Sequence, residues 1–194
     1  MDLKSIEPPL RFTEGTKHIW DKLAQILRTG WVQWEIPEPE NVAEHILAIR
    51  ELAMEWRENI LLKDEEFDDL LTIIEVHDWP EVIVGDLVIM GDERNFITLK
   101  NEKREKEKSA MEILCKDVPR GEEALLLYKR YEANVDDVAR YAKQLDKVQA
   151  VLLAKEYGEK YDRPGLLEEF LNYSERSIDI PFLVSELDKI RITS

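Results

Sequence analysis

Four side chains in this sequence could together hold a divalent metal ion. The chain has three histidines, and His77 is followed directly by Asp78. His45 and Asp146 lie on two other segments that have helical periodicity. Two imidazoles and two carboxylates suit a first-row dication, with water at the open positions. Because such an ion polarises a phosphoryl oxygen and lowers the pKa of bound water, this set would suit hydrolysis of a phosphate ester.

The position of Asp146 adds a physical reason to this set. It belongs to a series at helical spacing that is otherwise mostly apolar: Val135, Ala139, Ala142, Asp146, Gln149 and Leu153. A carboxylate beside an apolar face is costly to bury unless a cation, hydrogen bonds or a metal compensate for lost water. Simpler interpretations stay open, because His-Asp pairs occur by chance and Lys147 could pair with Asp146.

The elements that must position these residues are helices. Periodicity near 3.6 residues runs through the chain and strand-like alternation is nearly absent, which predicts an all-α fold. We expect helices over 14–29, from Asn41 onward, and over 64–77, 94–116, 121–132, 135–157, 165–175 and 181–191. Asn41 is a good N-cap, and Glu44 can complete a capping box.

The breaks between these helices follow from glycine and proline. We expect Gly30 to stop the first helix, and Pro37 and Pro39 to make 31–40 a loop. A short segment around 80–90 should be broken by Gly85 and Gly91.

Composition limits the classes of partner. The 194 residues carry a formal net charge of −15, which argues against binding to nucleic-acid polymers or anionic membranes. A small anionic substrate is still compatible, since a bound dication reverses the local charge.

There is no apolar run of about 18 residues and no secretory signal at the N-terminus. The single cysteine, Cys115, should be buried and inert. Together these features favour a cytoplasmic protein.

Five motifs occur in a distinctive order. They are Gly30-Trp31-Val32, PENVAEH ending at His45, HDWPEVIVGD from His77 to Asp86, KNEKREKEKSAM at 100–111, and KQLDKVQA containing Asp146. In order and spacing they resemble the HD-domain superfamily, and more closely its branch of small 5′-deoxynucleotidases. The resemblance covers about residues 15–157. It implies a single HD-domain helical bundle over 1–160, with a C-terminal helical extension, 161–194, packed on the same domain.

The resemblance also implies roles for individual residues. The implied metal ligands are His45, His77, Asp78 and Asp146, for Mn, Co or Mg, or for Zn, Ni or Fe in a crystal. Glu81 is implied to act near the attacking water or the leaving group, and Asp86 to have a supporting or acid/base role. The implied reaction is hydrolysis of deoxynucleoside 5′-monophosphates to deoxynucleoside and phosphate by a homodimer.

The surroundings of Trp31 bear on substrate binding. Trp31 could stack on a base or sugar, or it could anchor the core. Some members of the branch have an arginine directly before this tryptophan, in contact with the substrate. Here that position is Gly30, and Arg28 lies two residues back.

Several other polar residues keep simpler interpretations at this stage. Glu81 could be a surface carboxylate, and Asp86 could cap the next helical turn. Lys103 and Arg104 could approach a phosphate, but a solvated helix face is the favoured interpretation. His18 should lie at the surface and not be a ligand.

Two other classes of function stay open. One is hydrolysis of an alarmone or another nucleoside polyphosphate. Relatives with alarmone activity tend to carry Glu-Asp at the third and fourth positions after the HD pair, where this chain has Glu81-Val82. The other is a noncatalytic helical module that binds nucleotides or a partner protein, which the presence of all four implied ligands disfavours.

Overall fold

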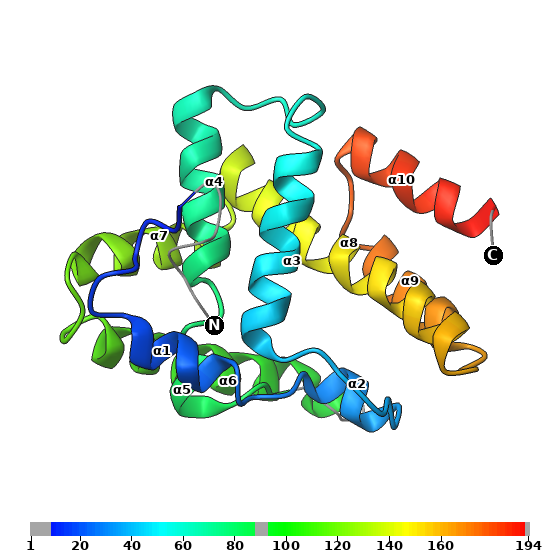
Figure 1. The fold of residues 1–194 in the computed structure, drawn as a ribbon, viewed down its shortest axis with the longest axis horizontal. Coiled ribbons are helices and arrows are strands. Elements are labelled where there is room, and N and C mark those ends of the chain that lie inside the picture. Colours follow the sequence, from blue (N-terminus) through cyan, green and yellow to red (C-terminus); the bar gives the residue numbers. More distant parts are fainter. Residues whose placement is uncertain (1–8, 88–92, 193–194) are drawn as a thin grey trace.

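The fold consists of helices, with no β-sheet among the residues described (Figure 1). The structure, a computed structural model, describes residues 9–87 and 93–192. Its helices are α1 (Lys17–Leu23), α2 (Thr29–Gln33), α3 (Val42–Glu55), α4 (Asp64–Val76), α5 (Glu81–Val84), α6 (Glu93–Leu114), α7 (Gly121–Ala133), α8 (Asp137–Lys160), α9 (Leu166–Glu175) and α10 (Pro181–Ile192). The predicted all-α class is therefore confirmed.

Helices α3, α4 and α8 pack on one another at the centre, and α7 packs on both α4 and α8. Their inward faces supply fully buried side chains, among them Ile46, Ile49, Leu70, Ile73 and Leu145. Burying one such side chain stabilises the fold by about 1.5–3 kcal/mol. Segments far apart in the sequence are thereby held in one rigid core.

The predicted start of α3 is confirmed. The Asn41 side chain accepts a hydrogen bond from the backbone N–H of Glu44, and the Glu44 carboxylate accepts one from the backbone N–H of Asn41. This reciprocal cap satisfies two amides that have no partner within the helix. It places His45 in the first turn of α3, on the buried side.

The predicted first helix over 14–29 is wrong in its second half. Helix α1 ends at Leu23, and α2 begins at Thr29. Between them Leu27 and Asn41 form an antiparallel bridge, and the Arg28 N–H donates to the Glu40 carbonyl. These long-range backbone hydrogen bonds replace the helical ones. Gly30 lies inside α2 and does not stop a helix, so the loop expected over 31–40 begins only after α2.

The two predicted C-terminal helices are confirmed as α9 and α10, and both pack on α8 (Figure 1). The aromatic ring of Phe182 in α10 also meets Trp56 edge-on, with 5.2 Å between ring centroids. The division of the chain at residues 160 and 161 stays a prediction, and the expected break at Gly91 lies outside the described residues. None of the described helices is long and apolar enough to cross a membrane.

Candidate metal centre

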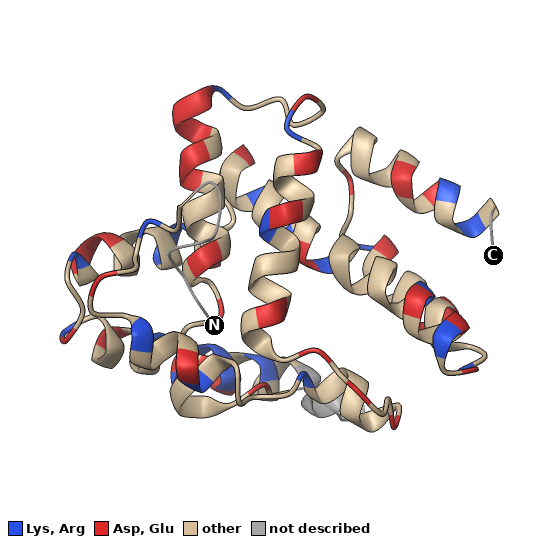
Figure 2. Ribbon diagram, in the orientation of Figure 1, with Lys and Arg blue, Asp and Glu red and all other residues tan. Residues whose placement is uncertain are grey.

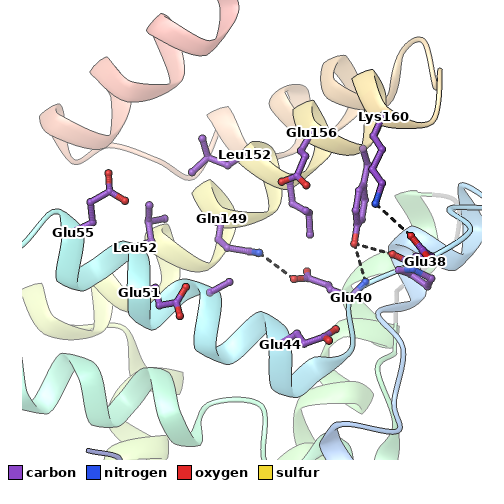
Figure 3. A pocket seen from close by; sticks show the side chains of 14 residues that line it. Glu38, Glu40, Glu44, Glu51, Leu52, Glu55, Gln149, Leu152, Glu156 and Lys160 are labelled. Atoms are coloured by element: carbon purple, nitrogen blue, oxygen red, sulfur yellow. Dashed lines mark hydrogen bonds and ion pairs between the residues drawn. The ribbon is translucent and has the colours of Figure 1, made fainter. Parts of the chain in front are cut away.

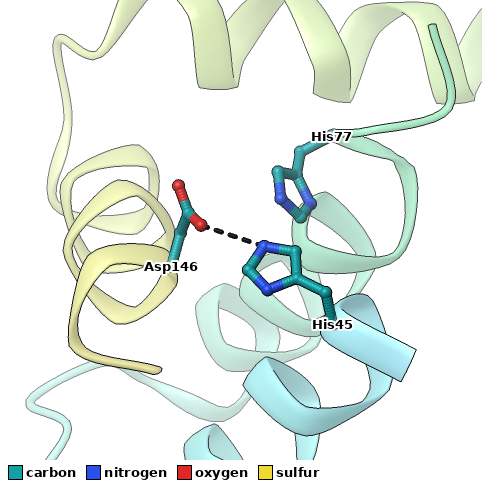
Figure 4. A group of neighbouring side chains, drawn as sticks. All are labelled: His45, His77 and Asp146. Atoms are coloured by element: carbon teal, nitrogen blue, oxygen red, sulfur yellow. Dashed lines mark ion pairs between the residues drawn. The ribbon is translucent and has the colours of Figure 1, made fainter. Parts of the chain in front are cut away.

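His45 from α3, His77 at the end of α4 and Asp146 from α8 converge on one point (Figure 4). One ligand atom from each residue lies within 4.8 Å of the other two, and His45 Nε2 is 3.0 Å from Asp146 Oδ1. The Nε2 atoms of both histidines are buried without a hydrogen bond of good geometry. Buried polar atoms normally have a partner. Two unbonded ring nitrogens facing a carboxylate are therefore a donor set that fits a divalent ion.

Asp78 lies at the edge of this group. Its Oδ2 atom is 3.2 Å from His77 Nε2, 3.7 Å from His45 Nε2 and 3.3 Å from Arg28 Nη1. Burial alone would raise the pKa of Asp78, but His77, Arg28 and His45 outweigh it and lower that pKa. Asp78 is therefore an ionised carboxylate next to both imidazoles. Its role as a fourth ligand stays a prediction.

The charges within the group are strongly linked. Burial would raise the pKa of Asp146, but the imidazole of His45, whose Nε2 lies 3.0 Å from Oδ1, lowers it to about 2. Burial and Arg28 lower the pKa of His45, but Asp146 and Glu40 outweigh them and raise it to about 9. Without an ion, a proton on His45 compensates the carboxylates. A metal would have to displace that proton, as is general for imidazole ligands.

Glu81 lies in the first turn of α5 and is only 4% exposed. Its Oε2 atom makes no hydrogen bond, and its backbone N–H donates to the Asp78 carbonyl. Burial, and then the charges of Asp78 and Asp86, raise the pKa of Glu81 well above the usual range. The structure therefore places a buried carboxyl group with one free oxygen beside Asp78.

Asp86 caps the start of α2 through hydrogen bonds to Thr29. Its carboxylate accepts a hydrogen bond from the Thr29 N–H, and its carbonyl accepts one from the Thr29 hydroxyl. A helix-capping role was one of the alternatives from sequence, although the capped helix is α2 and not the next one along the chain. The acid/base role of Asp86 stays a prediction.

Arg28 is the residue of this centre that the sequence did not place there. Its guanidinium pairs with Asp78, and its charge interacts with those of Asp86, Asp146 and Glu81. Burial would lower the pKa of Arg28, but these carboxylates raise it. In the sequence, the only signal for Arg28 was its position two residues before Gly30. The direction of the Arg28 side chain depends on the bridge between Leu27 and Asn41, which the sequence did not predict.

Comparison with known proteins identifies the family. The family model for the HD domain matches residues 20–181. This chain belongs to the HD-domain family. It is 32% identical to 5′-deoxynucleotidase HDDC2 of Mus musculus over 178 residues, which cover 89% of this chain and 85% of that protein. It is also 29% identical to 5′-deoxynucleotidase YGK1 of Saccharomyces cerevisiae, over 74% of this chain and 66% of that protein.

Solved structures share the fold of this HD-domain protein. A conserved hypothetical protein from Pyrococcus furiosus matches with a TM-score of 0.69 and 25% identity, over 90% of this chain and 96% of that one. A predicted metal-dependent phosphohydrolase from Magnetospirillum magnetotacticum MS-1 matches with a TM-score of 0.61 and 24% identity, over 93% and 96% of the two chains. The HD-domain fold expected from the sequence is confirmed.

Lys103, on the charged helix α6, interacts electrostatically with carboxylates of the HD-domain centre. Figure 2 shows basic and acidic residues side by side on α6, whereas acidic residues predominate on α3 and α4. Burial lowers the pKa of Lys103, but the charges of Glu107, Glu81 and Asp78 outweigh it and raise that pKa. The solvated face expected for the run at 100–108 is confirmed for most of its residues, which are exposed, whereas Lys103 is half-buried and pairs with Glu107. Arg104 instead pairs with Glu132.

Trp31 belongs to the core of the HD domain. It is 2% exposed, stacks on Phe170 with 4.4 Å between ring centroids, and donates its indole N–H to Glu40. Tyr157 meets the same ring edge-on. These contacts match the core-anchor interpretation and argue against stacking of Trp31 on a base or sugar.

The third histidine, His18, and the single cysteine, Cys115, lie where the sequence predicted. His18 is exposed. Cys115 is a buried free thiol, and burial raises its pKa to about 11. A thiol with a raised pKa is a poor nucleophile, so Cys115 has no part in the HD-domain site.

Proposed function

We propose that this HD-domain protein is a metal-dependent hydrolase of phosphate monoesters, and that its substrates are deoxynucleoside 5′-monophosphates. The observation that carries the proposal is the group of the buried His45 and His77 with the half-buried Asp146, in which two ring nitrogens are left unbonded. The choice of substrate is supported by the relatives, which are named 5′-deoxynucleotidases.

The chain offers separate groups for the ion and for the phosphate. His45, His77, Asp146 and Asp78 would hold Mn²⁺, Co²⁺ or Mg²⁺. Such an ion, when bound, neutralises phosphoryl oxygens and lowers the pKa of bound water. Arg28 would bind the phosphate, because its planar guanidinium has five N–H donors and Asp78 accepts from only one of its nitrogens.

Glu81 would orient the attacking water or protonate the 5′-oxygen of the leaving nucleoside. The free and buried Oε2 of Glu81 supports this role, as does the backbone hydrogen bond that fixes Glu81 relative to Asp78. Asp86 would act through the backbone, since it holds Thr29 and thereby the neighbouring Arg28. A positioned acid or base typically contributes 10²–10⁴-fold to a rate.

Phosphate release from a panel of nucleotides, measured with Mn²⁺, Co²⁺ or Mg²⁺, tests this function. We expect turnover of deoxynucleoside 5′-monophosphates that Asp146→Ala abolishes and that Glu81→Gln lowers by about 10²–10⁴-fold in kcat. His18→Ala is the matched control, because His18 is exposed and should leave turnover unchanged. Full activity of Asp146→Ala would disprove the site. Hydrolysis of a nucleoside polyphosphate alone would favour the alarmone alternative.

We further propose that the protein is a cytoplasmic homodimer. The resemblance to the 5′-deoxynucleotidase branch supports the dimer, and the single free cysteine supports a reducing compartment. Light scattering should then give about twice the chain mass of 22.8 kDa.

A further inference from the structure

The side of His45 that faces away from His77 and Asp146 is held by two further residues. Gln149 Oε1 lies 2.9 Å from His45 Nδ1. On its other side, Gln149 Nε2 donates to Glu40 Oε2 at 3.1 Å (Figure 3). Glu40 Oε1 lies 3.5 Å from the same Nδ1 atom. Glu40 and Gln149 are 8% and 6% exposed, so water contributes little to this chain of hydrogen bonds.

The directions of these hydrogen bonds fix the proton of His45. The Glu40 carboxylate only accepts hydrogen bonds, as shown also by the indole N–H of Trp31 that it accepts at 3.0 Å. The NH₂ of Gln149 must therefore face Glu40, which turns the amide oxygen toward His45. That oxygen also only accepts, so Nδ1 must carry a proton. In neutral His45 the free electron pair is then on Nε2, the atom that faces Asp146.

We infer that Glu40 and Gln149 are positioning residues that hold a proton on Nδ1 of His45, so that Nε2 is the nitrogen that binds a metal once its own proton is displaced. This inference rests on the metal site proposed above. Outer partners of this kind orient an imidazole and raise its basicity toward the ion. Neither residue lies among the grouped ligands, so both act through His45.

Glu40 also contacts Arg28, the residue proposed to bind the phosphate. Its carbonyl accepts the backbone N–H of Arg28, and its own N–H donates to the hydroxyl of Tyr157. The backbone of Glu40 therefore sets the place of Arg28, while its side chain sets the proton of His45. Replacing the Glu40 carboxylate with an amide changes the side-chain link to His45 and keeps the backbone link to Arg28.

A groove between α3 and α8 provides a matched control. It has a volume of about 620 Å³, and both Glu40 and Gln149 line it (Figure 3). Glu51 lines the same groove, but no hydrogen bond or ion pair within the described residues joins Glu51 to His45. Glu51→Gln removes the same charge from the same groove and leaves the support of His45 intact.

Mn²⁺ titration by calorimetry, followed by kinetics, tests the inference. We expect Glu40→Gln and Gln149→Leu to weaken Mn²⁺ binding by about 10–100-fold, and Glu51→Gln to leave it unchanged. The Mn²⁺ concentration for half-maximal rate should rise equally, while kcat at saturating Mn²⁺ stays within about threefold of wild type. Wild-type affinity in both variants would overturn the inference, while loss of binding in Asp146→Ala would still uphold the proposed metal site.

A readout without metal separates the two proposals completely. In the metal-free protein, the Nδ1–H proton of His45 should give a slowly exchanging, downfield NMR resonance, because it is buried and hydrogen-bonded. Gln149→Leu and Gln149→Met should both lose this resonance while circular dichroism shows retained helix. Two such variants guard against misfolding of one. A resonance that persists in both folded variants would overturn the positioning role of Gln149, whether or not the chain binds Mn²⁺.

Discussion

The proposed binding of phosphate by Arg28 can be tested by a substitution that keeps its positive charge beside Asp78. Its guanidinium pairs with Asp78 but donates to none of the grouped ligands His45, His77 and Asp146. Arg28→Lys keeps the charge and loses the planar fork that fits a phosphate. We expect kcat/KM for deoxynucleoside 5′-monophosphates to fall about 10–100-fold, the range for one charged hydrogen bond. Steady-state kinetics at saturating Mn²⁺ would measure this.

The control for Arg28 is another arginine in an ion pair. Arg140 pairs with Asp137 and Asp179 near the start of α8, away from the ligand group. Arg140→Lys should leave both kcat/KM and Mn²⁺ affinity unchanged. If Arg28→Lys behaves like Arg140→Lys, Arg28 is a structural partner of Asp78 and does not touch the phosphate.

At the scale of elements, α8 matters most, because it carries both Asp146 and Gln149. Its first turn is held by Asp136, whose carboxylate accepts from the Ala139 N–H at 3.0 Å and from Arg130 Nε at 2.8 Å. Loss of an N-cap side chain costs about 0.5–2 kcal/mol. We expect Asp136→Ala to lower the free energy of unfolding by that amount in urea denaturation, with Mn²⁺ affinity reduced less than in Glu40→Gln.

The same carboxylate predicts a pH dependence. Burial would raise the pKa of Asp136, but hydrogen bonds from Arg130 and Ala139 lower it. Because the folded pKa lies below the unfolded one, near 4, the charge stabilises the fold above about pH 4 and this contribution is lost in acid. Asp136→Asn keeps a cap without charge. Its deficit in unfolding free energy should therefore be constant near neutral pH and should close as the pH falls below about 4. A deficit that persists in acid would contradict this.

The sequence predicted those elements whose signals are local. The apolar stripe and the Asn41 cap define α3, and the place of a carboxylate on a mostly apolar stripe singled out Asp146. Local periodicity could not predict the break after α1, because that break depends on hydrogen bonds to the distant Glu40. The direction of Arg28 depends on the same long-range contacts and was out of reach of the sequence. The sequence offered core burial as one of two interpretations of Trp31, and contacts with the distant Phe170 and Tyr157 favour it.

For the whole molecule, the proposed metal centre joins three helices that are distant in sequence. His45, His77 and Asp146 come from α3, α4 and α8, which also form the hydrophobic core. An ion can bind at this site only in the folded chain, because unfolding separates the three ligands. Binding therefore adds directly to the free energy of unfolding, by about 2.7 kcal/mol when the free ion is at 100 times its Kd.

This linkage predicts the effect of removing the metal. For a chain of this size, about 1 kcal/mol corresponds to about 2–4 °C in Tm, so EDTA should lower the Tm of the Mn²⁺-loaded protein by about 5–10 °C. Scanning calorimetry with and without EDTA would measure the shift. In Asp146→Ala the shift should disappear, because one ligand from α8 is lost, whereas Glu51→Gln should keep it. If Mn²⁺ raised the Tm of Asp146→Ala as much as that of wild type, the ion would bind elsewhere, and the three helices would not share a metal centre.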